Sequence, residues 1–522
     1  MGKTKLEQAM KAFVSERRFR MTLFLEGIAV GAITGLVIVA FRFLIEGLEL
    51  FWGERYAKVH PGDFWMAVLL LLAFSSIAVV LYKITQKEPM ASGSGIPQIK
   101  GILLGKMHMK WASVLVYKFL GGVLAIGSGL SLGREGPSVQ LGATIGQGMS
   151  RISARSRFEE KFLLTSGAGA GLAAAFNAPL AGVVFCLEEL QKNFSPFVLM
   201  ATISATISAT VVSQYFFGDA PIFHLDVLSV LPVRYYSILV IAGIFLGFLG
   251  IGFNKALSFS LDLYDKMPLE YGFAKPLIPV LLAAGLGLLF PQILGGGNHL
   301  VDSVLTTQYA MGFLLLLFTG KFLFTMICFG SGVPGGIFLP MLVLGALAGS
   351  VFGSGVECLG IVATGYVENF IVFAMAGYFA AVVKSPVTGS ILIMEMTGSF
   401  QHMLPLICVS MAAYVTADML NGKPVYDILL ERSLKKQQKA KFQMKYKRLL
   451  FEVVVENGSD LAGKCIHQIS WPQYSLVINI RRGENEISPV GDTRIQAGDY
   501  IYIFANEKDG AQLSSMGQFG NQ

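Results

Sequence analysis

Charged side chains are scarce in this sequence. Asp, Glu, Lys and Arg together make up 14% of the 522 residues, whereas 53% are hydrophobic, and the mean hydropathy is positive. Because a soluble domain carries about 25% charged residues, this deficit excludes an ordinary water-soluble protein. The composition predicts an integral membrane protein.

Cysteine is also scarce, and the motifs of common catalytic sites are missing. No CxxC spacing occurs, so we expect free thiols and no metal site. The sequence has no Walker loop and nothing that resembles a nucleophile beside a base, so we expect no cofactor and no enzyme activity. No cleavable signal peptide is visible ahead of the first apolar run. The five cysteines are Cys186, Cys328, Cys358, Cys408 and Cys465.

Apolar runs are numerous, but only the first is clearly long enough for a full membrane crossing, which needs about 20 residues. Glycine or proline interrupts many of the shorter ones. The pattern predicts a bundle of membrane helices, several of them broken. The runs are Met21–Ile45, Phe64–Leu81, Val114–Leu130, Phe197–Val212, Ile238–Ile251, Leu277–Phe290, Met311–Phe329 and Leu404–Val415.

The net charge of +7 is concentrated in two places, the first twenty residues and Lys435–Arg448. Basic segments beside membrane helices stay in the cytoplasm. We therefore interpret both as marks of orientation, with both chain ends cytoplasmic, and not as nucleic-acid binding sites.

One stretch stands out within the apolar sequence, Gly133-Arg134-Glu135-Gly136-Pro137. Glycine permits unusual backbone angles, and proline suits the first turn of a helix. The stretch therefore predicts a loop that leads into a helix N-terminus at membrane depth. Such an N-terminus carries about half a positive charge and unpaired N–H donors, which suit an anion. We expect the Glu135 carboxylate and a free anion to compete for it, and an ionisable group inside a membrane is functional by default.

A second stretch of the same kind runs from Ser92 to Pro97 and places Ser94 between two glycines. The segment Gln98–Leu104 that follows is too short to cross a membrane. It predicts a half-helix that begins inside the membrane, with the Ser94 hydroxyl as an additional donor.

The chain also repeats itself. Lys118-Phe119-Leu120 recurs as Lys321-Phe322-Leu323, an offset of 203 residues (321 − 118), and Gly127-Ser128-Gly129 recurs as Gly330-Ser331-Gly332 at the same offset. Two related halves, residues 18–218 and 231–431, are therefore predicted. Transporters with such repeats hold their substrate between the halves, at discontinuous helix ends.

The two halves differ at the residues of greatest chemical interest. The counterpart of Glu135 is Phe338, so at this position only the first half offers a titratable group. Glu188 has the counterpart Glu395, which indicates a structural role, whereas the counterpart of its neighbour Glu189 is Met396. Lys118 and Lys321 occupy equivalent positions, where they either support the scaffold or raise the local positive potential.

The composition changes after residue 432. We expect strands at Phe451–Val455, Leu476–Ile480, Glu486–Val490 and Tyr500–Phe504 and a helix at Asp460–Gln468, which together form a small cytoplasmic α/β domain. The predicted organisation is an N-terminal cytoplasmic segment (1–17), a membrane domain (18–432), a basic linker (433–449) and the tail domain (450–522).

Four stretches together resemble the signature sequences of the CLC family of chloride channels and chloride/proton antiporters. They are Gly93-Ser94-Gly95-Ile96-Pro97, Gly133-Arg134-Glu135-Gly136-Pro137, Gly336-Ile337-Phe338-Leu339-Pro340 and Tyr426. The resemblance covers residues 18–432. It implies an all-helical membrane subunit of two inverted repeats with broken helices, which forms a homodimer with one anion pathway in each subunit.

The resemblance implies a chloride site. The hydroxyls of Ser94 and Tyr426 are expected to hold the ion, and the backbone N–H groups of Ile337 and Phe338 to complete the site. Tyr414, near the end of the preceding apolar run, is the alternative to Tyr426.

The resemblance also implies roles for two carboxylates. Glu135 matches the external gate and proton acceptor, and Glu189 matches the inner proton-transfer glutamate of the antiporters. The implied function is exchange of chloride for protons across the plasma membrane of a bacterium. A passive chloride channel is the alternative. A fluoride exchanger is another, although relatives of that kind typically replace the serine of the first motif and lack the inner glutamate.

The tail resembles the C-terminal half of the RCK-type regulatory domains of bacterial potassium transport systems. It does not resemble the paired CBS domains of eukaryotic CLC proteins. The resemblance implies a ligand sensor in which paired tails bind a small anionic ligand such as a cyclic dinucleotide. The other partners expected are chloride, protons, membrane lipids and a second copy of the chain, with no nucleic acid.

Overall fold

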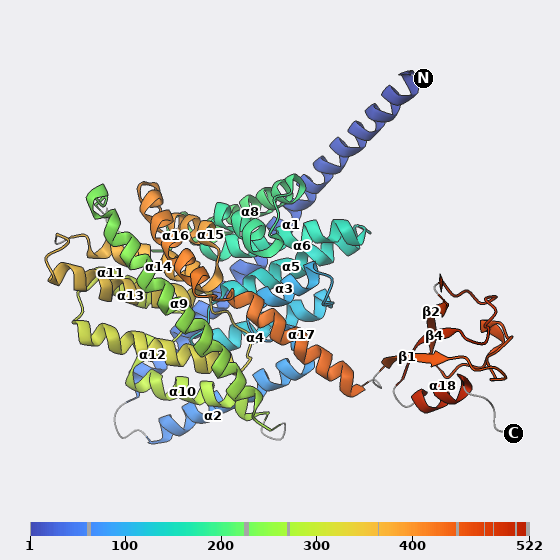
Figure 1. Cartoon of the computed structure of the whole chain (residues 1–522). Helices are drawn as coiled ribbons and strands as arrows, with labels where there is room; N and C mark the ends of the chain where they lie inside the picture. The colour runs from blue at the N-terminus through green and yellow to red at the C-terminus, as the bar shows by residue number, and fades with distance from the viewer. Residues whose placement is uncertain are drawn as a thin grey trace. The chain divides into compact units, whose positions relative to one another are not determined.

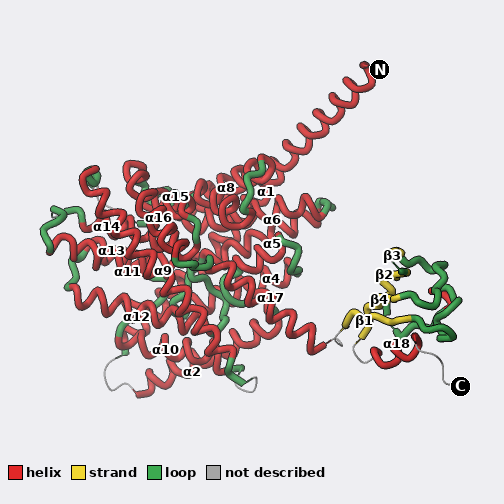
Figure 2. The backbone as a smooth tube through the Cα atoms, viewed as in Figure 1, coloured by secondary structure: helices red, strands yellow, loops and turns green. Residues whose placement is uncertain are grey.

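The chain forms two compact units, Met1–Leu430 and Glu431–Gln522. The computed structural model describes residues 2–59, 64–223, 229–268, 272–363, 365–444, 448–473, 475–483, 485–506 and 509–517. Helices and connecting loops make up the first unit, whereas the second contains a β-sheet (Figure 1, Figure 2). Helix α17 (Val425–Met444) begins in the first unit and continues into the second.

The helices of the first unit follow the same order twice. In Figure 1 the first half runs from blue to green and the second from green to orange. The pairs are α1 (Gly2–Lys58) and α9 (Tyr236–Asp265), α2 (Phe64–Lys87) and α10 (Ala274–Leu289), α3 (Ile96–Leu103) and α11 (Asn298–Thr306), α4 (Trp111–Gly127) and α12 (Met311–Gly330), α5 (Glu135–Ile152) and α13 (Phe338–Cys358), α6 (Arg157–Phe176) and α14 (Val367–Val383), α7 (Pro179–Phe185) and α15 (Pro386–Thr397), and α8 (Pro196–Phe217) and α16 (Met403–Met419).

Short helical turns connect several of these helices. The 3₁₀ turns η1 (Pro89–Ala91) and η5 (Pro291–Ile293) occupy equivalent places in the two halves, and a π-helical turn, η2 (Cys186–Gln191), extends α7. Two further 3₁₀ turns are η3 (Val233–Tyr235) and η6 (Phe400–His402).

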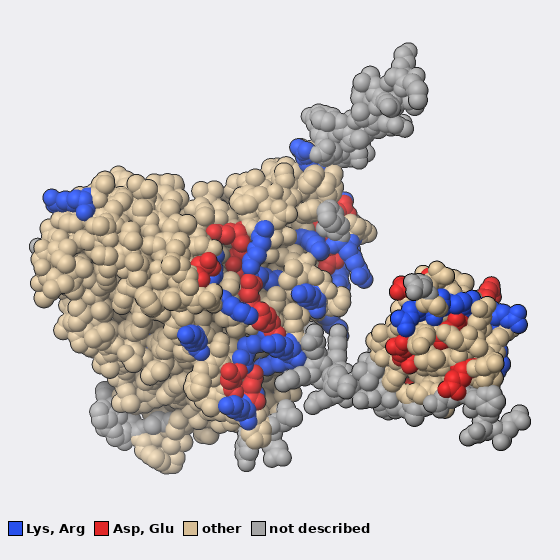
Figure 3. Space-filling view, viewed as in Figure 1, with Lys and Arg blue, Asp and Glu red and all other residues tan. Residues whose placement is uncertain are grey.

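Among the described residues, seven helices are long and apolar enough to cross a membrane. Each apolar run of the sequence falls on a helix, and α13, which is rich in small residues, also qualifies as a span. On the face seen in Figure 3, most charged side chains of the first unit gather on one part of the surface, and few lie elsewhere. These findings confirm an all-helical, multi-pass membrane unit in which α3, α7, α11 and α15 are too short to span a bilayer.

The two halves are related by a two-fold rotation. Gly133 and Gly336, which are equivalent in the repeat, pair as an antiparallel β-bridge. The N–H of Gly133 donates to the carbonyl of Gly336 at 2.7 Å, and the N–H of Gly336 donates to the carbonyl of Gly133 at 2.8 Å. Equivalent segments that meet in an antiparallel manner run in opposite directions, so the repeats are inverted.

A second set of hydrogen bonds follows the same symmetry. The N–H of Gly93 donates to the carbonyl of Gly332 at 3.2 Å, and its counterpart Gly295 donates to the carbonyl of Gly129 at 2.8 Å. The loop ahead of each short helix is therefore held by a loop of the opposite half.

Two glutamates also form reciprocal hydrogen bonds between the halves. Glu188 accepts hydrogen bonds from the first turn of α15, and Glu395 accepts them from the first turn of α7. A carboxylate is favourable at a helix N-terminus because it satisfies free N–H groups and the helix dipole. The structural role expected for Glu188 is confirmed. The donors are the amides of Val387 and Thr388 for Glu188 and those of Leu180 and Ala181 for Glu395.

The two buried lysines support loops. Lys118 on α4 donates to the carbonyls of Ala91 and Gly93 at 3.0 and 2.5 Å. Lys321 on α12 donates to the equivalent carbonyls of Ile293 and Gly295 at 3.0 and 2.6 Å. The sequence left open whether these lysines support the scaffold or raise the local positive potential, and these contacts favour the scaffold role.

The second unit is an antiparallel sheet with strand order β1-β4-β2-β3. Its own core includes Val453, Ile480, Ile501 and Leu513. The elements are β1 (Arg448–Val454), the 3₁₀ turn η7 (Ile466–Gln468), β2 (Leu476–Arg482), β3 (Asn485–Ile487), β4 (Tyr500–Asn506) and α18 (Gly510–Gly517).

The prediction of a helix at Asp460–Gln468 is wrong. The backbone there bonds to a distant loop: the N–H of Gly463 donates to Ile495, that of Ile466 to Thr493, and that of His467 to Gly491. Gly463 also has a φ of +84°, which an α-helix does not accommodate. The strand expected at Glu486–Val490 ends at Ile487, and α18 was not anticipated.

An ion pair with a buried carboxylate joins the end of β2 to the residue before β4 in the second unit. Arg482 Nε and Nη2 donate to the two carboxylate oxygens of Asp499, each at 2.8 Å, and Asp499 is fully buried. Burial opposes ionisation, but the hydrogen bonds from Arg482 and from the amide of Gln496 outweigh it and hold the pKa of Asp499 below its ordinary value.

We expect Asp499→Asn to destabilise the second unit. Folding lowers the pKa of the Asp499 carboxyl, so its ionised form stabilises the folded unit. This contribution to the free energy of unfolding is fully present above the ordinary Asp pKa of about 3.9 and is lost as the pH falls through the lower pKa of the folded state. The free energy of unfolding at pH 7 should fall by about 1.5–3 kcal/mol. Denaturant unfolding of the second unit from pH 7 to pH 3 measures this difference, which should shrink at acid pH.

Asp492→Asn is the matched control, because the Asp492 side chain is 94% exposed. Equal unfolding free energies for Asp499→Asn and the parent protein at pH 7 would contradict the assigned role of the pair.

Candidate functional site

Four helices begin inside the first unit at the residues that the sequence singles out. Helix α5 begins at Glu135 and α13 at Phe338, α3 begins at Ile96 and α17 at Val425, and all four starting residues are buried. The loop and helix N-terminus predicted around Glu135 are confirmed, with Pro137 in the first turn. The first N–H groups of each helix have no partner within that helix.

The starts of α3, α5 and α13 meet. The Gly133–Gly336 bridge joins the loops ahead of α5 and α13. A Cβ placed on Gly136 would lie 2.5 Å from Ser94 Oγ and 3.1 Å from the Cα of Gly336. Only glycine therefore permits this approach, which brings the Ser94 loop against both other helix starts. A φ of +99° at Gly95 then turns the chain into α3.

Several buried polar atoms at this meeting point lack a protein partner. Ser94 Oγ and Tyr426 Oη make no hydrogen bond within the described part of the chain, and the Glu135 carboxylate has no side-chain partner there. The backbone N–H groups of Glu135 and Leu339 lie close enough to act on that carboxylate. Most buried polar atoms in proteins are paired. Two hydroxyl donors and the N–H groups of helix starts suit an anion, and a buried carboxylate without a side-chain partner can take up a proton.

Tyr426 links the two parts of the site. It lies close enough to both Glu135 and Glu189 for each carboxylate to act on it electrostatically. The loop before it is held by Asn254, whose side-chain amide donates to the carbonyls of Val382 and Lys423, each at 3.1 Å. The alternative Tyr414 is partly exposed on α16, so Tyr426 provides the buried hydroxyl.

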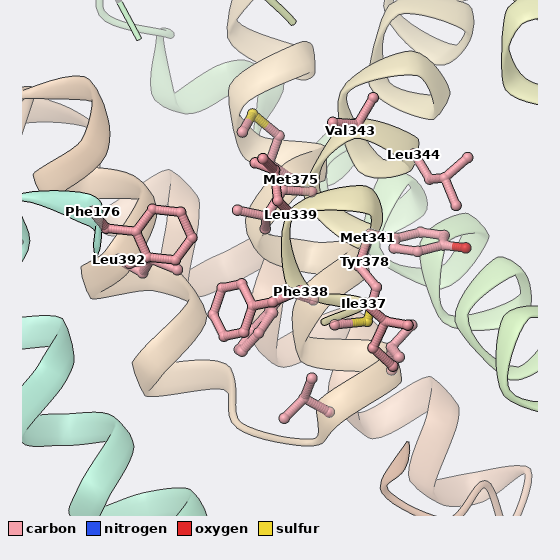
Figure 4. Close-up of a cluster of buried hydrophobic side chains, with 14 of the residues drawn as sticks. Phe176, Ile337, Phe338, Leu339, Met341, Val343, Leu344, Met375, Tyr378 and Leu392 are labelled. Atoms are coloured by element: carbon pink, nitrogen blue, oxygen red, sulfur yellow. The ribbon is translucent and has the colours of Figure 1, made fainter. Parts of the chain in front are cut away.

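Phe338 forms an apolar wall beside the helix starts (Figure 4). Its ring centre lies 4.7 Å from that of Phe379, 5.4 Å from that of Phe176 and 6.5 Å from that of Phe185. Ile337 is buried in the same cluster. Such a wall excludes water, which strengthens electrostatic interactions at the site.

Positive charge and a cavity lie next to Glu135. Arg134 and Arg42 are close enough to act on its carboxylate, and Arg134 Nη1 donates to Glu46 at 2.8 Å. A cavity of about 740 Å³ reaches Arg134 and Leu339 and is also lined by Glu46. The cavity therefore lies beside residues that flank Glu135.

Glu189 lies on η2 and is buried, 2% exposed. One carboxylate oxygen accepts from Lys100 Nζ at 2.6 Å and the other from Ser385 Oγ at 3.0 Å. The adjacent Glu188 points to the start of α15 instead. The two neighbouring glutamates are thus separated into a structural group and one within reach of the site.

The structure brings Ser94, Ile337, Phe338 and Glu135 together at the helix starts, and Tyr426 lies near enough to Glu135 and Glu189 to interact electrostatically with both. Their roles in transport remain predictions. Sequence reasoning missed Lys100, although a lysine on a short apolar helix, six residues after Ser94, was a detectable signal. Among the described residues, no group of three or more His, Cys, Asp or Glu could hold a metal ion.

Comparison with known proteins identifies relatives of both units. Residues 71–418 match the model of the voltage gated chloride channel family, and residues 450–516 match the TrkA-C domain. A protein of Salmonella arizonae named H(+)/Cl(-) exchange transporter ClcA is 35% identical over 437 residues, which cover 82% of this chain and 92% of that protein. The ClcA of a Vibrio cholerae strain is 35% identical over 450 residues, covering 83% and 94%.

Solved structures show the same fold. The crystal structure of a slow cyanobacterial Cl⁻/H⁺ antiporter matches with a TM-score of 0.76 and 31% identity, covering 80% of this chain and 99% of that one. A CLC-type fluoride/proton antiporter matches with a TM-score of 0.64 over 76% of this chain and 95% of that one. At 22% identity, this second likeness concerns the fold alone.

Proposed function

The chain belongs to the voltage gated chloride channel family, and on that premise we propose that it is a secondary transporter that exchanges chloride for protons. The observation that carries the proposal is Glu135, whose carboxylate is fully buried at the meeting point of helix starts and has no side-chain hydrogen-bond partner among the described residues. The named exchangers among its relatives support the choice of ions.

The first step of the proposed mechanism is competition for one site. Chloride accepts hydrogen bonds from the hydroxyls of Ser94 and Tyr426 and from the backbone N–H groups of Ile337 and Phe338. The ionised Glu135 carboxylate competes for the same positive helix ends. Protonation neutralises Glu135, which then leaves the outer position to chloride.

The second step carries the proton. Glu189 exchanges protons with the cytoplasm and relays them to Glu135 past Tyr426, so the anion and the proton move in opposite directions. No chemical bond is made or broken other than those to the proton. The driving force is the ion gradients, with a membrane potential contributing about 2.3 kcal/mol per charge per 100 mV.

We further propose the plasma membrane of a bacterium as the location, with both chain ends in the cytoplasm. The support is the basic N-terminal segment, because positive residues remain on the cytoplasmic side. The family resemblance supports a homodimer surrounded by lipid, with one anion pathway in each subunit.

The direct test of exchange is proton uptake driven by a chloride gradient in liposomes that contain the purified protein. An exchanger moves protons against their own gradient, and its reversal potential shifts with the pH gradient. A reversal potential independent of the pH gradient identifies the alternative, a passive chloride channel.

Glu135→Gln and Glu189→Gln should each abolish proton transport and leave chloride flux. Glutamine cannot accept a proton, so the proton flux should fall to the leak of protein-free liposomes. Proton uptake and chloride efflux recorded on the same liposomes measure both effects. The control is Glu357→Gln, because Glu357 is partly exposed in the last turn of α13. Uphill proton transport by either site variant would disprove that assignment.

Ser94→Ala should weaken chloride binding and alter selectivity among halides and nitrate. The loss of one hydrogen bond to a charged ligand corresponds to about 1.5–3 kcal/mol, or roughly a tenfold or greater loss of affinity. Calorimetric titration and reversal potentials measure the two effects. Ser92→Ala is the control, because the Ser92 hydroxyl already donates to the Gly332 carbonyl at 2.5 Å. Unchanged selectivity in Ser94→Ala would remove Ser94 from the site.

The tail supports a second, regulatory function. Its match to the TrkA-C domain favours a ligand sensor, and α17 connects it directly to Tyr426. We propose that a small anionic ligand, such as a cyclic dinucleotide, binds between paired tails.

We expect a 440–522 fragment to bind a cyclic dinucleotide, since the second unit has a core of its own. Isothermal calorimetry measures the heat of binding, with mononucleotides as the comparison. The absence of heat with any nucleotide would leave the tail with a structural role.

A further inference from the structure

Lys100 connects the inner carboxylate to a second acidic group. Its Nζ lies 2.6 Å from Glu189 Oε1 and 2.5 Å from Asp427 Oδ1. The side chains of Lys100 and Glu189 are 5% and 2% exposed, whereas that of Asp427 is 30% exposed. One ammonium group is thus shared between a buried carboxylate and one that reaches solvent.

The same elements carry the anion site. Lys100 lies on α3, the helix that follows Ser94, and Asp427 lies on α17 directly after Tyr426. Ser385, which donates to the other oxygen of Glu189, precedes α15. The position of the inner carboxylate is therefore tied to the helices that position the two site hydroxyls.

Charges of alternating sign continue from the buried site to the surface. Asp427 Oδ2 lies 2.9 Å from Lys192 Nζ, and the Lys192 side chain is 52% exposed. The charged or titratable groups that act on Glu189 are Lys100 in direct contact, and Asp427, Lys192 and Tyr426 from farther away. Among the described residues, Lys100 is the one positive group in direct contact with Glu189, and Asp427 shares its ammonium.

This sharing has a physical consequence. An isolated buried carboxylate is forced into its neutral form, and an ammonium in contact with it restores the charged form. If Lys100 had Glu189 as its sole partner, the pair would hold the carboxylate ionised and resist protonation. Asp427 weakens that hold because it gives the ammonium a second partner to keep when Glu189 takes up a proton.

We propose that Lys100 and Asp427 are positioning residues for proton exchange at Glu189, on the basis of the proposed function of Glu189. Lys100 favours the ionised form of the Glu189 carboxylate and holds it between the ammonium and the Ser385 hydroxyl. When Glu189 accepts a proton from cytoplasmic water, the Lys100 ammonium keeps its ion pair with Asp427. The pair sets the cytoplasmic pH range over which the transporter loads and releases protons.

The test uses the full-length protein in planar lipid bilayers, with the pH of each side changed separately. Lys100→Met should lower the ratio of proton flux to chloride flux. The pH at which proton flux is half-maximal, measured on the side that Glu189 faces, should rise by about 1–3 pH units. Asp427→Asn should move this midpoint downward, because Lys100 then serves Glu189 alone. Lys100→Arg should restore the parent profile, and Lys192→Met, altered at the exposed end, should shift it least.

A purely structural role of Lys100 and Asp427, in which they only hold α3 and α17 together, predicts a loss of activity with an unchanged pH midpoint. The opposite directions of the two shifts distinguish the proposed role from that one. Unchanged midpoints in Lys100→Met and Asp427→Asn would overturn the inference. If Lys100→Met does not fold, the downward shift in Asp427→Asn decides. Absence of chloride-driven proton transport in the parent protein would overturn the proposed function itself, and the two failures are thereby distinguishable.

Discussion

The burial of helix N-termini in an apolar interior is the constraint on which this structure depends. Each of these helix starts presents unpaired N–H groups and a positive dipole end among buried residues. At α5 and α13 the wall around Phe338 makes this field strong. A negative group is favourable there. The proposed exchange uses this preference, because the carboxylate of Glu135 and a chloride ion would then compete for the same place.

The rest of the first unit keeps these helix starts in place without filling the site. Gly133 and Gly336 join on the two-fold axis, and each half caps the other through Glu188 and Glu395. Lys118 and Lys321 hold the loops ahead of the short helices by their carbonyls. These polar bonds satisfy buried groups close to the site, so that the hydroxyls of Ser94 and Tyr426 remain available. The contacts that repeat in both halves form the scaffold, whereas Glu135, whose counterpart in the second half is Phe338, breaks the symmetry at the residue to which we assign the exchange.

Sequence reasoning predicted most of this arrangement because broken helices leave local marks. Glycine, proline and a hydroxyl or carboxylate within five residues indicate a helix start wherever apolar sequence surrounds them. The repeat was legible at Lys118 and Lys321, where identical tripeptides recur. The tail was predicted less well: residues 460–468 have a helical pattern, but their amides pair with the loop at 491–495. Pairing between distant segments has no local signature.

The sequence by itself determined the membrane class, the two related halves, the loops at Ser94 and Glu135, and the distinction between Glu188 and Glu189. These follow from composition, spacing and comparison of one half with the other. Only the tertiary structure decided that Lys100 on α3 shares its ammonium between Glu189 and Asp427, which lie 89 and 327 residues away. It also decided that Gly136 approaches Ser94 closely enough to exclude a side chain. The physical reason is that an ion pair or a close backbone contact depends on distance in space, which the order of residues along a chain does not contain.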